Sequence, residues 1–382
     1  MIPYGRQDIS DEDIAAVVET LRSPFLTQGP AVEAFEAAVR DYVGASHAIA
    51  VNSATSALHI ACLALDVGPG DVVWTVPNTF VASANCARLC GADVDFVDID
   101  PVSLNLSAER LAEKLAATDS PPKVVIPVHF SGRSADMAAI AALAKQYGFK
   151  VIEDASHAIG ADHDGAKVGA CGHSDIAVFS FHPVKIVTTG EGGIATTNDA
   201  ALARRMGLYR SHGVTRDEDL MEATPEGGWS YEMVDLGLNY RLTDIHATLG
   251  LAQMRRLDQF VTRRNMLVDR YDTLLQDLPL ILPKQPEAGG SSWHLYVIQI
   301  DAERTNKTRR EVYDALRAGG IGVNVHYIPA HLQPYYARQG FKRGDFPASE
   351  TYYDRAITIP LYPAMTEADQ DAVVAALQAA LA

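Results

Sequence analysis

From residue 47 onward, apolar and polar positions divide the chain into alternating strands and helices. Short apolar runs predict the strands, and between them apolar residues recur at helical spacing. The predicted strands span residues 47–52, 71–76, 93–98, 123–128 and 149–153, and the predicted helices span residues 53–65, 79–90, 107–117 and 134–147. Repeated strand–helix–strand units indicate an α/β fold with a mainly parallel central sheet and helices on both faces. Ligands of such sheets bind at the carboxyl ends of the strands.

The alternation fades after about residue 213, and a different pattern follows. Residues 215–232 are polar and predict a long surface loop. Thr243 is a suitable N-cap for an amphipathic helix whose apolar face is marked by Ile245, Leu249, Ala252 and Leu257. Two helices are predicted before the alternation, at residues 11–21 and 31–42. After it, helices are predicted at residues 307–318 and 366–381 and strands at residues 293–300 and 323–327. We therefore expect a large domain over residues 1–250 and a smaller α+β domain over residues 251–382.

Composition and charge narrow the classes of function. A chain of 382 residues is long enough for two domains, and its formal net charge of −16 argues against a nucleic-acid-binding or anionic-membrane surface. No signal peptide or spanning segment is evident, which predicts a soluble, cytoplasmic protein. Four cysteines fit a reducing compartment. A zinc site from Cys86, Cys90, Cys171 and His173 is possible, but small buried apolar side chains are the commoner role for such cysteines, and we expect no metal.

Residues 176–197 hold one lysine between two apolar runs. A strand is predicted over residues 176–181, His182-Pro183 ends it, and a glycine-containing turn separates Lys185 from the second run at Ile194. A buried lysine is costly unless its amine is paired, deprotonated or used covalently. A loop lysine that points to solvent is equally compatible with this stretch alone.

Three other strand ends carry polar or aromatic side chains. Residues 52–57, Asn-Ser-Ala-Thr-Ser-Ala, leave a strand and enter a helix, which suits a phosphate but also an ordinary N-cap. Asp154 ends another strand, with His157 three residues later, and could hold a positive ring nitrogen or cap a helix. Phe80 could stack on a planar ligand or lie in the core.

Because successive parallel strands end on one rim of the sheet, these groups are expected to lie close together. A phosphate site, a stacking ring, a carboxylate and a lysine in one place predict a binding site for pyridoxal phosphate. The lysine would form a Schiff base, and the carboxylate would keep the ring nitrogen protonated so that the ring acts as an electron sink. Residues 190–195 loosely fit a dinucleotide fingerprint, but they precede a strand instead of opening a helix after one.

Residues 179–193, Phe-Ser-Phe-His-Pro-Val-Lys-Ile-Val-Thr-Thr-Gly-Glu-Gly-Gly, resemble the Schiff-base segment of the DegT/DnrJ/EryC1/StrS sugar aminotransferases. The resemblance spans nearly the whole chain. It includes Leu-Thr-Gln-Gly-Pro at 26–30, Pro-Asn-Thr-Phe-Val-Ala at 77–82, Glu-Asp-Ala-Ser-His at 153–157, Leu-Asn-Tyr-Arg-Leu-Thr-Asp at 238–244 and His-Tyr-Ile-Pro-Ala-His at 326–331. It implies a fold type I aminotransferase that acts on nucleotide-linked keto sugars.

The resemblance also implies roles for individual residues. Lys185 would be the Schiff-base lysine, Asp154 the partner of the pyridine nitrogen, and His157 a neighbour of the ring and its hydroxyl. The cofactor would further be held by Phe80 on its ring and by phosphate contacts from Ala54, Thr55, Ser180 and, from a second subunit, Asn239. Candidates for contacts with the sugar or nucleotide are Thr27, Gln28, Arg241, His326 and His331. The role of Asn239 implies a homodimer with shared active sites.

Within the family, the segments at 53–58, 180–185 and 326–331 most resemble the 4-aminotransferase of the pseudaminic-acid pathway. That likeness implies L-glutamate as donor, a UDP-linked 4-keto-6-deoxy-N-acetylhexosamine as acceptor and pyridoxamine phosphate as intermediate. Alternatives are another nucleotide-linked 3- or 4-keto sugar, such as a dTDP or GDP sugar, and a non-catalytic ligand-binding regulator. A dehydratase of the same fold would carry histidine in place of Lys185.

Overall fold

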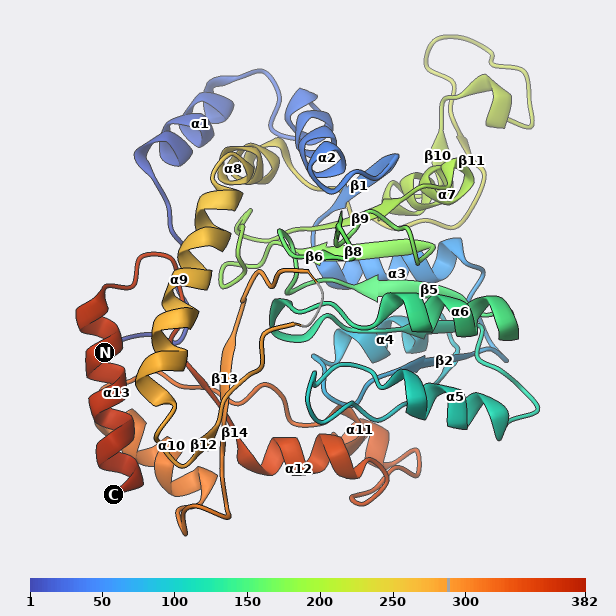
Figure 1. Ribbon diagram of the computed structural model, residues 1–382. Coiled ribbons are helices and arrows are strands. Elements are labelled where there is room, and N and C mark those ends of the chain that lie inside the picture. The colour runs from blue at the N-terminus through green and yellow to red at the C-terminus, as the bar shows by residue number, and fades with distance from the viewer. Residues whose placement is uncertain (287–288) are drawn as a thin grey trace.

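A mainly parallel sheet forms the centre of the molecule in the computed structural model, which describes residues 1–286 and 289–382 (Figure 1). Neighbouring strands β8, β5, β4, β2 and β3 pair in parallel, and β9 pairs antiparallel with both β8 and β1. The sheet has the order β1 (His47–Val51), β9 (Gly193–Thr197), β8 (Ile176–Ser180), β5 (Lys150–Asp154), β4 (Val124–Ile126), β2 (Val72–Thr75), β3 (Asp93–Phe96). The predicted α/β class is confirmed.

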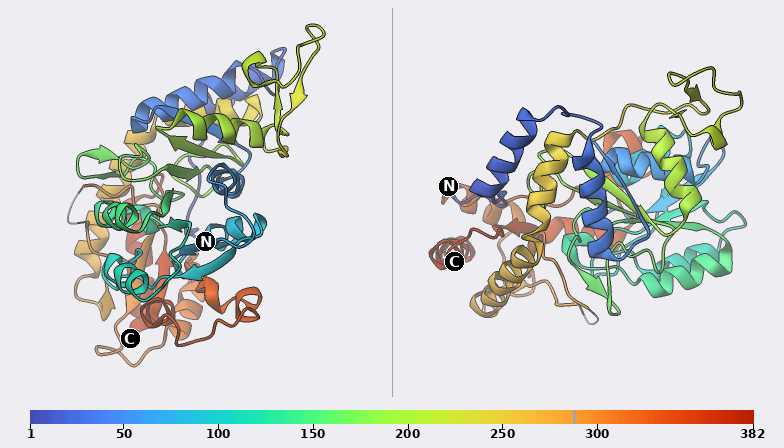
Figure 2. Two further views of the ribbon diagram at one scale, coloured as in Figure 1. Left: turned by 90° about the vertical axis from the view of Figure 1, so that its right-hand side faces the viewer. Right: turned by 90° about the horizontal axis from the view of Figure 1, so that it is seen from above.

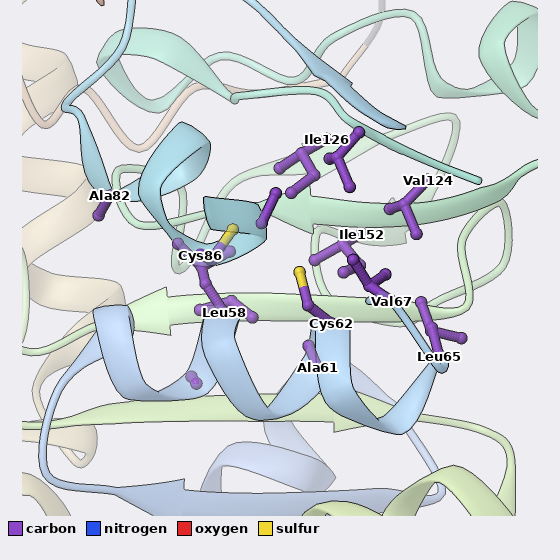
Figure 3. Close-up of a cluster of buried hydrophobic side chains, with 14 of the residues drawn as sticks. Leu58, Ala61, Cys62, Leu65, Val67, Ala82, Cys86, Val124, Ile126 and Ile152 are labelled. Carbon is purple, nitrogen blue, oxygen red and sulfur yellow. The ribbon is translucent and has the colours of Figure 1, made fainter. Parts of the chain in front are cut away.

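Apolar side chains cover both faces of this sheet. Val73, Val124 and Ile152 belong to one apolar core, whereas their neighbours Val125 and Val151 belong to another. This alternation follows from the period of two in a strand. Figure 3 shows the first core, which lies between the sheet and helices α3 (Ala54–Ala64) and α4 (Ala82–Leu89). Helices α5 (Ala108–Ala116) and α6 (Met137–Tyr147) cover the opposite face.

The helices at the β1 edge differ from the prediction in one place. Helices α1 (Asp11–Arg22) and α2 (Pro30–Val43) both pack on α8 (Asp244–Met254), which begins at the predicted N-cap Thr243. The prediction of a single helix that continues through Leu257 is wrong, because α8 ends at Met254 and a separate helix, α9 (Leu257–Leu275), follows. Arg256 lies at the bend, where its guanidinium donates to Asp8 at 2.7 Å and to Asp13 at 2.6 Å.

A third apolar core, separate from the two that cover the faces of the central sheet, contains side chains from α9 and from the C-terminal quarter of the chain. Its sheet has the order β12 (Leu280–Ile281), β13 (Tyr296–Ile300), β14 (Ala356–Ile359). The helices of this region are α10 (Arg309–Ala318), α12 (Pro347–Arg355) and α13 (Glu367–Leu381). The prediction of a strand near residues 323–327 is wrong, because the structure has only an isolated bridge from Asn324 to Thr358 there. The domain boundary at residue 250 stays a prediction.

A hairpin projects from the sheet edge after α7 (Ala200–Arg210), as both views of Figure 2 show. It contains β10 (Val214–Thr215), β11 (Glu232–Met233) and the 3-10 turn Glu218–Leu220, where a loop was expected. Short elements elsewhere are β6 (Asp162–His163), β7 (Ala166–Lys167), α11 (Pro334–Ala337) and the 3-10 turns Phe130–Gly132 and Ala330–Leu332. Within the described residues, no helix combines the length and apolar character needed to cross a bilayer.

Candidate active site

A cavity of about 660 Å³ opens where β2, β5 and β8 end. It brings together most of the predicted site residues from five separate stretches of the chain. Those that line it are Ala54, Thr55, Phe80, Asp154, His157, Ser180, Lys185 and His326. This is the rim at which a parallel sheet is expected to bind its ligand.

The N-terminus of α3 forms one end of the cavity. Ser53 is the N-cap, and its hydroxyl accepts from the Ser56 amide at 3.1 Å. The amides of Ala54 and Thr55 have no acceptor in the described part of the chain, as is usual in a first helical turn. With the hydroxyls of Thr55 and Ser180 beside them, these amides and the helix dipole suit a phosphate.

Asp154 presents its carboxylate to the cavity from the end of β5. One oxygen accepts from Ser83 Oγ at 2.6 Å, and the other accepts from the Ser156 amide at 3.1 Å. Ser83 Oγ is also 2.7 Å from Thr79 Oγ1. A buried carboxylate held in this way has a fixed orientation and can accept from a protonated ring nitrogen.

Lys185 follows the break at His182-Pro183, lines the cavity and is only partly exposed. The Lys185 amide donates to the His182 carbonyl at 2.9 Å, which closes a tight turn. Burial lowers the pKa of the amine from 10.5 to about 8, and the charge of Asp154 opposes that shift. An amine that loses its proton near neutral pH can act as a nucleophile and as a base.

A model of the DegT/DnrJ/EryC1/StrS aminotransferase family matches residues 7–378. The chain belongs to this family. The spore coat polysaccharide biosynthesis protein SpsC of Bacillus subtilis is 41% identical over 380 residues, which cover 99% of this chain and 96% of that protein.

Solved structures of sugar aminotransferases have the same fold over their whole length. Helicobacter pylori PseC, an aminotransferase of pseudaminic-acid biosynthesis, superposes with a TM-score of 0.90 at 28% identity and covers 100% of this chain and 99% of its own. Spr1654 of Streptococcus pneumoniae in its PMP form gives a TM-score of 0.91 at 29% identity, again over 100% and 99% of the two chains. The chain is therefore a sugar aminotransferase with the fold type I architecture, and its cofactor is pyridoxal phosphate.

The residues of the cavity fit this cofactor. A Cβ added to Gly193 on β9 would lie 2.4 Å from the Ala54 amide nitrogen and 2.4 Å from the Ser53 carbonyl carbon. Only glycine therefore lets β9 approach the first turn of α3 so closely. The Phe80 side chain is 59% exposed although it lines the cavity, so its ring is available to cover a planar ligand.

Replacing Gly193 with alanine should weaken pyridoxal phosphate binding at least about tenfold, because the added methyl group would displace the amides at the α3 N-terminus that are suited to a phosphate. Fluorescence titration of the apo protein measures this change, and thermal unfolding shows whether the variant folds. The matched control is Gly207→Ala in α7, where an added Cβ meets no atom within 4 Å. Unchanged cofactor affinity in Gly193→Ala would contradict the assignment of this end of the cavity.

The rate at which Lys185 bonds covalently to added pyridoxal phosphate should rise with pH and level off above about 8. The protonated amine has no lone pair, so attack requires the neutral form, which dominates above the pKa. Asp154→Asn should shift the midpoint to lower pH, because the Asp154 charge stabilises the ammonium form. Borohydride trapping and mass spectrometry across a pH series give the curve. A midpoint near the ordinary lysine value of 10.5 would refute the effect of burial.

Several residues that line the cavity were not predicted. They are polar or aromatic groups that arrive from both ends of the chain: Tyr4, His294, Asn324, Tyr327 and Gln333. His294 and His157 have ring centroids 4.5 Å apart. Burial and the charge of Lys185 hold the pKa of both imidazoles well below the ordinary value, and they lower that of His326 to about 3. Tyr4 and His294 carry no sequence signal, since neither follows a strand of the central sheet.

Other predicted site residues do not line this cavity. Thr27, Gln28 and Asn239 are exposed, and Arg241 is partly buried beside β1, bridged to Val51. Their roles stay predictions, and Asn239 was expected to act in a partner's site.

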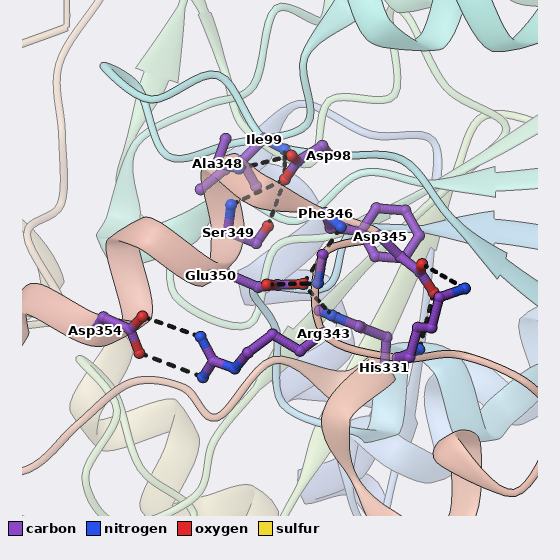
Figure 4. Close-up of polar contacts among 12 residues, drawn as sticks. Asp98, Ile99, His331, Arg343, Asp345, Phe346, Ala348, Ser349, Glu350 and Asp354 are labelled. Atoms are coloured by element: carbon purple, nitrogen blue, oxygen red, sulfur yellow. Dashed lines mark hydrogen bonds and ion pairs between the residues drawn. The ribbon is translucent and has the colours of Figure 1, made fainter.

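His331 has a different environment from the one predicted. It is fully buried, and its Nε2 lies 2.9 Å from Glu350 Oε1, which also accepts from the Gly344 amide at 2.8 Å (Figure 4). These bonds tie the segment after His326 to α12. A contact between His331 and the sugar stays a prediction, and its placement favours a structural role.

Among the described residues, no group of three or more histidine, cysteine or acidic side chains is arranged to hold a metal ion. Cys86 packs in the core between α3 and the sheet, whereas Cys171 lies beside β9, where it donates to the Thr196 carbonyl. Cys86 and Cys171 are thus in different parts of the fold, so the four residues of the possible zinc site are not brought together.

Proposed function

We propose that this aminotransferase moves the amino group of L-glutamate to C4 of UDP-2-acetamido-2,6-dideoxy-β-L-arabino-hex-4-ulose. The product would be UDP-4-amino-4,6-dideoxy-N-acetyl-β-L-altrosamine, on the route to pseudaminic acid. The presence of Lys185, the α3 N-terminus and Asp154 in one cavity supports the proposal for the reaction. The full-length likeness to PseC supports the choice of sugar.

The residues of the cavity have separate tasks in this reaction. When bound, pyridoxal phosphate supplies a carbonyl group that carries the amino group and a ring that accepts electrons. The amides of Ala54 and Thr55 would hold its phosphate, and the Asp154 carboxylate would accept from the protonated ring nitrogen. Lys185 is neutral for part of the cycle, so it would take the proton from Cα of glutamate and deliver it to the cofactor carbon that receives the amino group. In the second half it would take a proton from that carbon and deliver one to C4 of the sugar.

Exposed apolar side chains support a homodimer as the active form. They lie on and after the projecting hairpin, away from the central core: Trp229, Tyr231, Met233 and Leu236. Asn239 follows them along the chain and is exposed in the single subunit. A second copy of the chain would cover this surface and bring Asn239 to the phosphate end of the other subunit's cavity.

Mixing two inactive variants tests this sharing. In a mixed dimer of Lys185→Ala and Asn239→Ala subunits, one site lacks both residues and the other site has both. Random mixing makes half of the dimers mixed, so activity should recover to about a quarter of the wild-type value. Activity is measured after the two proteins are unfolded and refolded together, with each variant alone as control. No recovery on mixing would argue that each site is built from one chain.

The identity of the product decides the acceptor. NMR of the product formed from glutamate and a panel of UDP-, dTDP- and GDP-linked 3- and 4-keto sugars gives both the position and the stereochemistry of amination. We expect the UDP-linked arabino-4-hexulose to give the highest kcat/KM.

A second candidate is another nucleotide-linked keto sugar. The 41% identity with SpsC, a protein of spore coat polysaccharide biosynthesis, is higher than the 28% identity with PseC and supports this alternative. Faster turnover of a dTDP-linked sugar in the same panel would establish it and exclude the first proposal.

A further inference from the structure

The Ser131 amide fixes which nitrogen of His157 carries the proton. It lies in the 3-10 turn after β4, where Ser131 adopts a left-handed conformation with φ of 62°, and it approaches His157 Nδ1 at 3.3 Å. A backbone amide can only donate, so Nδ1 must present a lone pair. Since burial and the charge of Lys185 keep the ring neutral, its one proton is on Nε2.

The other side of the ring faces Tyr327. His157 Nε2 and Tyr327 Oη are 3.1 Å apart. Because Nε2 carries the proton, it donates and the tyrosine oxygen accepts. The reverse arrangement would place a proton on Nδ1 directly against the Ser131 N–H, so two donors would oppose each other at 3.3 Å.

This arrangement is held from several sides. Ser292 Oγ donates to the His157 carbonyl at 3.1 Å, and Ser291 Oγ donates to the Gly132 carbonyl at 3.0 Å, so one segment anchors both the histidine and the turn. The Tyr327 ring lies near three other aromatic rings, at centroid distances of 6.2 Å to Phe80, 6.3 Å to Phe130 and 4.9 Å to His326. The tyrosine hydroxyl therefore has little freedom of position.

We infer that the chain from the Ser131 amide through His157 to Tyr327 orients the Tyr327 hydroxyl proton into the cavity as a hydrogen-bond donor for an oxygen of the sugar acceptor. Burial and the charge of Asp154 raise the pKa of Tyr327, so the hydroxyl keeps its proton. No second partner of Tyr327 Oη exists among the residues that the structure describes. A neutral donor suits a neutral carbonyl or hydroxyl oxygen, whereas the carboxylates of glutamate bind cations more strongly. The choice of the sugar rests on the function proposed above, but the direction of the protons does not.

Nitrogen NMR tests the tautomer without any turnover. In apo protein labelled with ¹⁵N-histidine at neutral pH, we expect a pyridine-like shift for His157 Nδ1 and a pyrrole-like shift for Nε2. The signals are assigned by their loss in His157→Gln. The opposite pair of shifts would overturn the inference.

Kinetics of Tyr327→Phe test the donor. The phenylalanine keeps the ring contacts and removes the hydroxyl. We expect the KM for the keto sugar to rise about threefold to tenfold, as for loss of one neutral hydrogen bond, while the KM for glutamate and the rate of the glutamate half-reaction stay unchanged. An unchanged sugar KM, or equal effects on both substrates, would overturn the inference.

The matched control is Tyr296→Phe. Its hydroxyl also makes one side-chain hydrogen bond, to Asp272 at 2.6 Å, but it lies outside the cavity, so both KM values should stay unchanged. If the wild-type protein showed no glutamate half-reaction at all, the proposed function would fail, whereas the NMR result would still decide the tautomer.

Discussion

Replacing Lys185 with alanine should reduce transamination roughly a thousandfold or more, because in the proposed reaction its side chain serves as both nucleophile and base. Lys185 lines the cavity, and burial lowers the pKa of its amine to about 8. No other lysine is among the described residues that line the cavity. The variant should still bind pyridoxal phosphate through the α3 N-terminus, but without the absorbance of the covalently bound cofactor.

Glutamate turnover and the absorbance spectrum of the variant measure this change. Lys150→Ala is the matched control, since Lys150 pairs with Asp175 at the surface, with 55% of its side chain exposed, and should not affect turnover. Substantial activity in Lys185→Ala would refute the assignment of the nucleophile.

Replacing Asp154 with asparagine should lower kcat by about a hundredfold to a thousandfold, since removing one partner of a buried charge pair costs about 3–5 kcal/mol. The asparagine has nearly the same shape and can still accept from Ser83, so the change removes mainly the charge. Without that charge the ring nitrogen of the cofactor is protonated less and withdraws electrons less well.

Ser83→Ala separates charge from orientation. It removes the 2.6 Å hydrogen bond and keeps the carboxylate, so we expect a loss of only about tenfold, the effect of one hydrogen bond to a charged group. Steady-state kcat values for both variants give the comparison. Equal losses would show that the orientation of Asp154, and not its charge, dominates.

The sequence was sufficient to predict the parts of the site that follow strands. Asp154, Phe80 and the first turn of α3 come at or shortly after the end of an apolar run, and parallel strands must end on one rim. The antiparallel placement of β9 between β1 and β8 could not be inferred, because apolar composition is the same for either direction. The break between α8 and α9 also escaped prediction, because it depends on ion pairs of Arg256 with Asp8 and Asp13, about 245 residues away in the sequence.

Residues that reach the cavity through tertiary packing were beyond sequence reasoning. His294 precedes β13 of the C-terminal region, and Tyr4 lies in the N-terminal segment, where its carbonyl accepts from the Leu361 amide at 3.0 Å. His331 is a further case. The family resemblance implies a ligand contact for His331, which stays a prediction, but nothing in the sequence indicated that His331 would be buried against Glu350.

The wide spacing of the lining residues also has a consequence for folding. The cavity is bounded by residues from Tyr4 to Gln333, so its walls are in contact only after nearly the whole chain has been synthesised and packed. Contacts between such distant residues form slowly, and large chains reach them through partly folded intermediates. Uptake of pyridoxal phosphate therefore reports the last stage of folding, and its absorbance can be used to measure how much of a refolding preparation has become native.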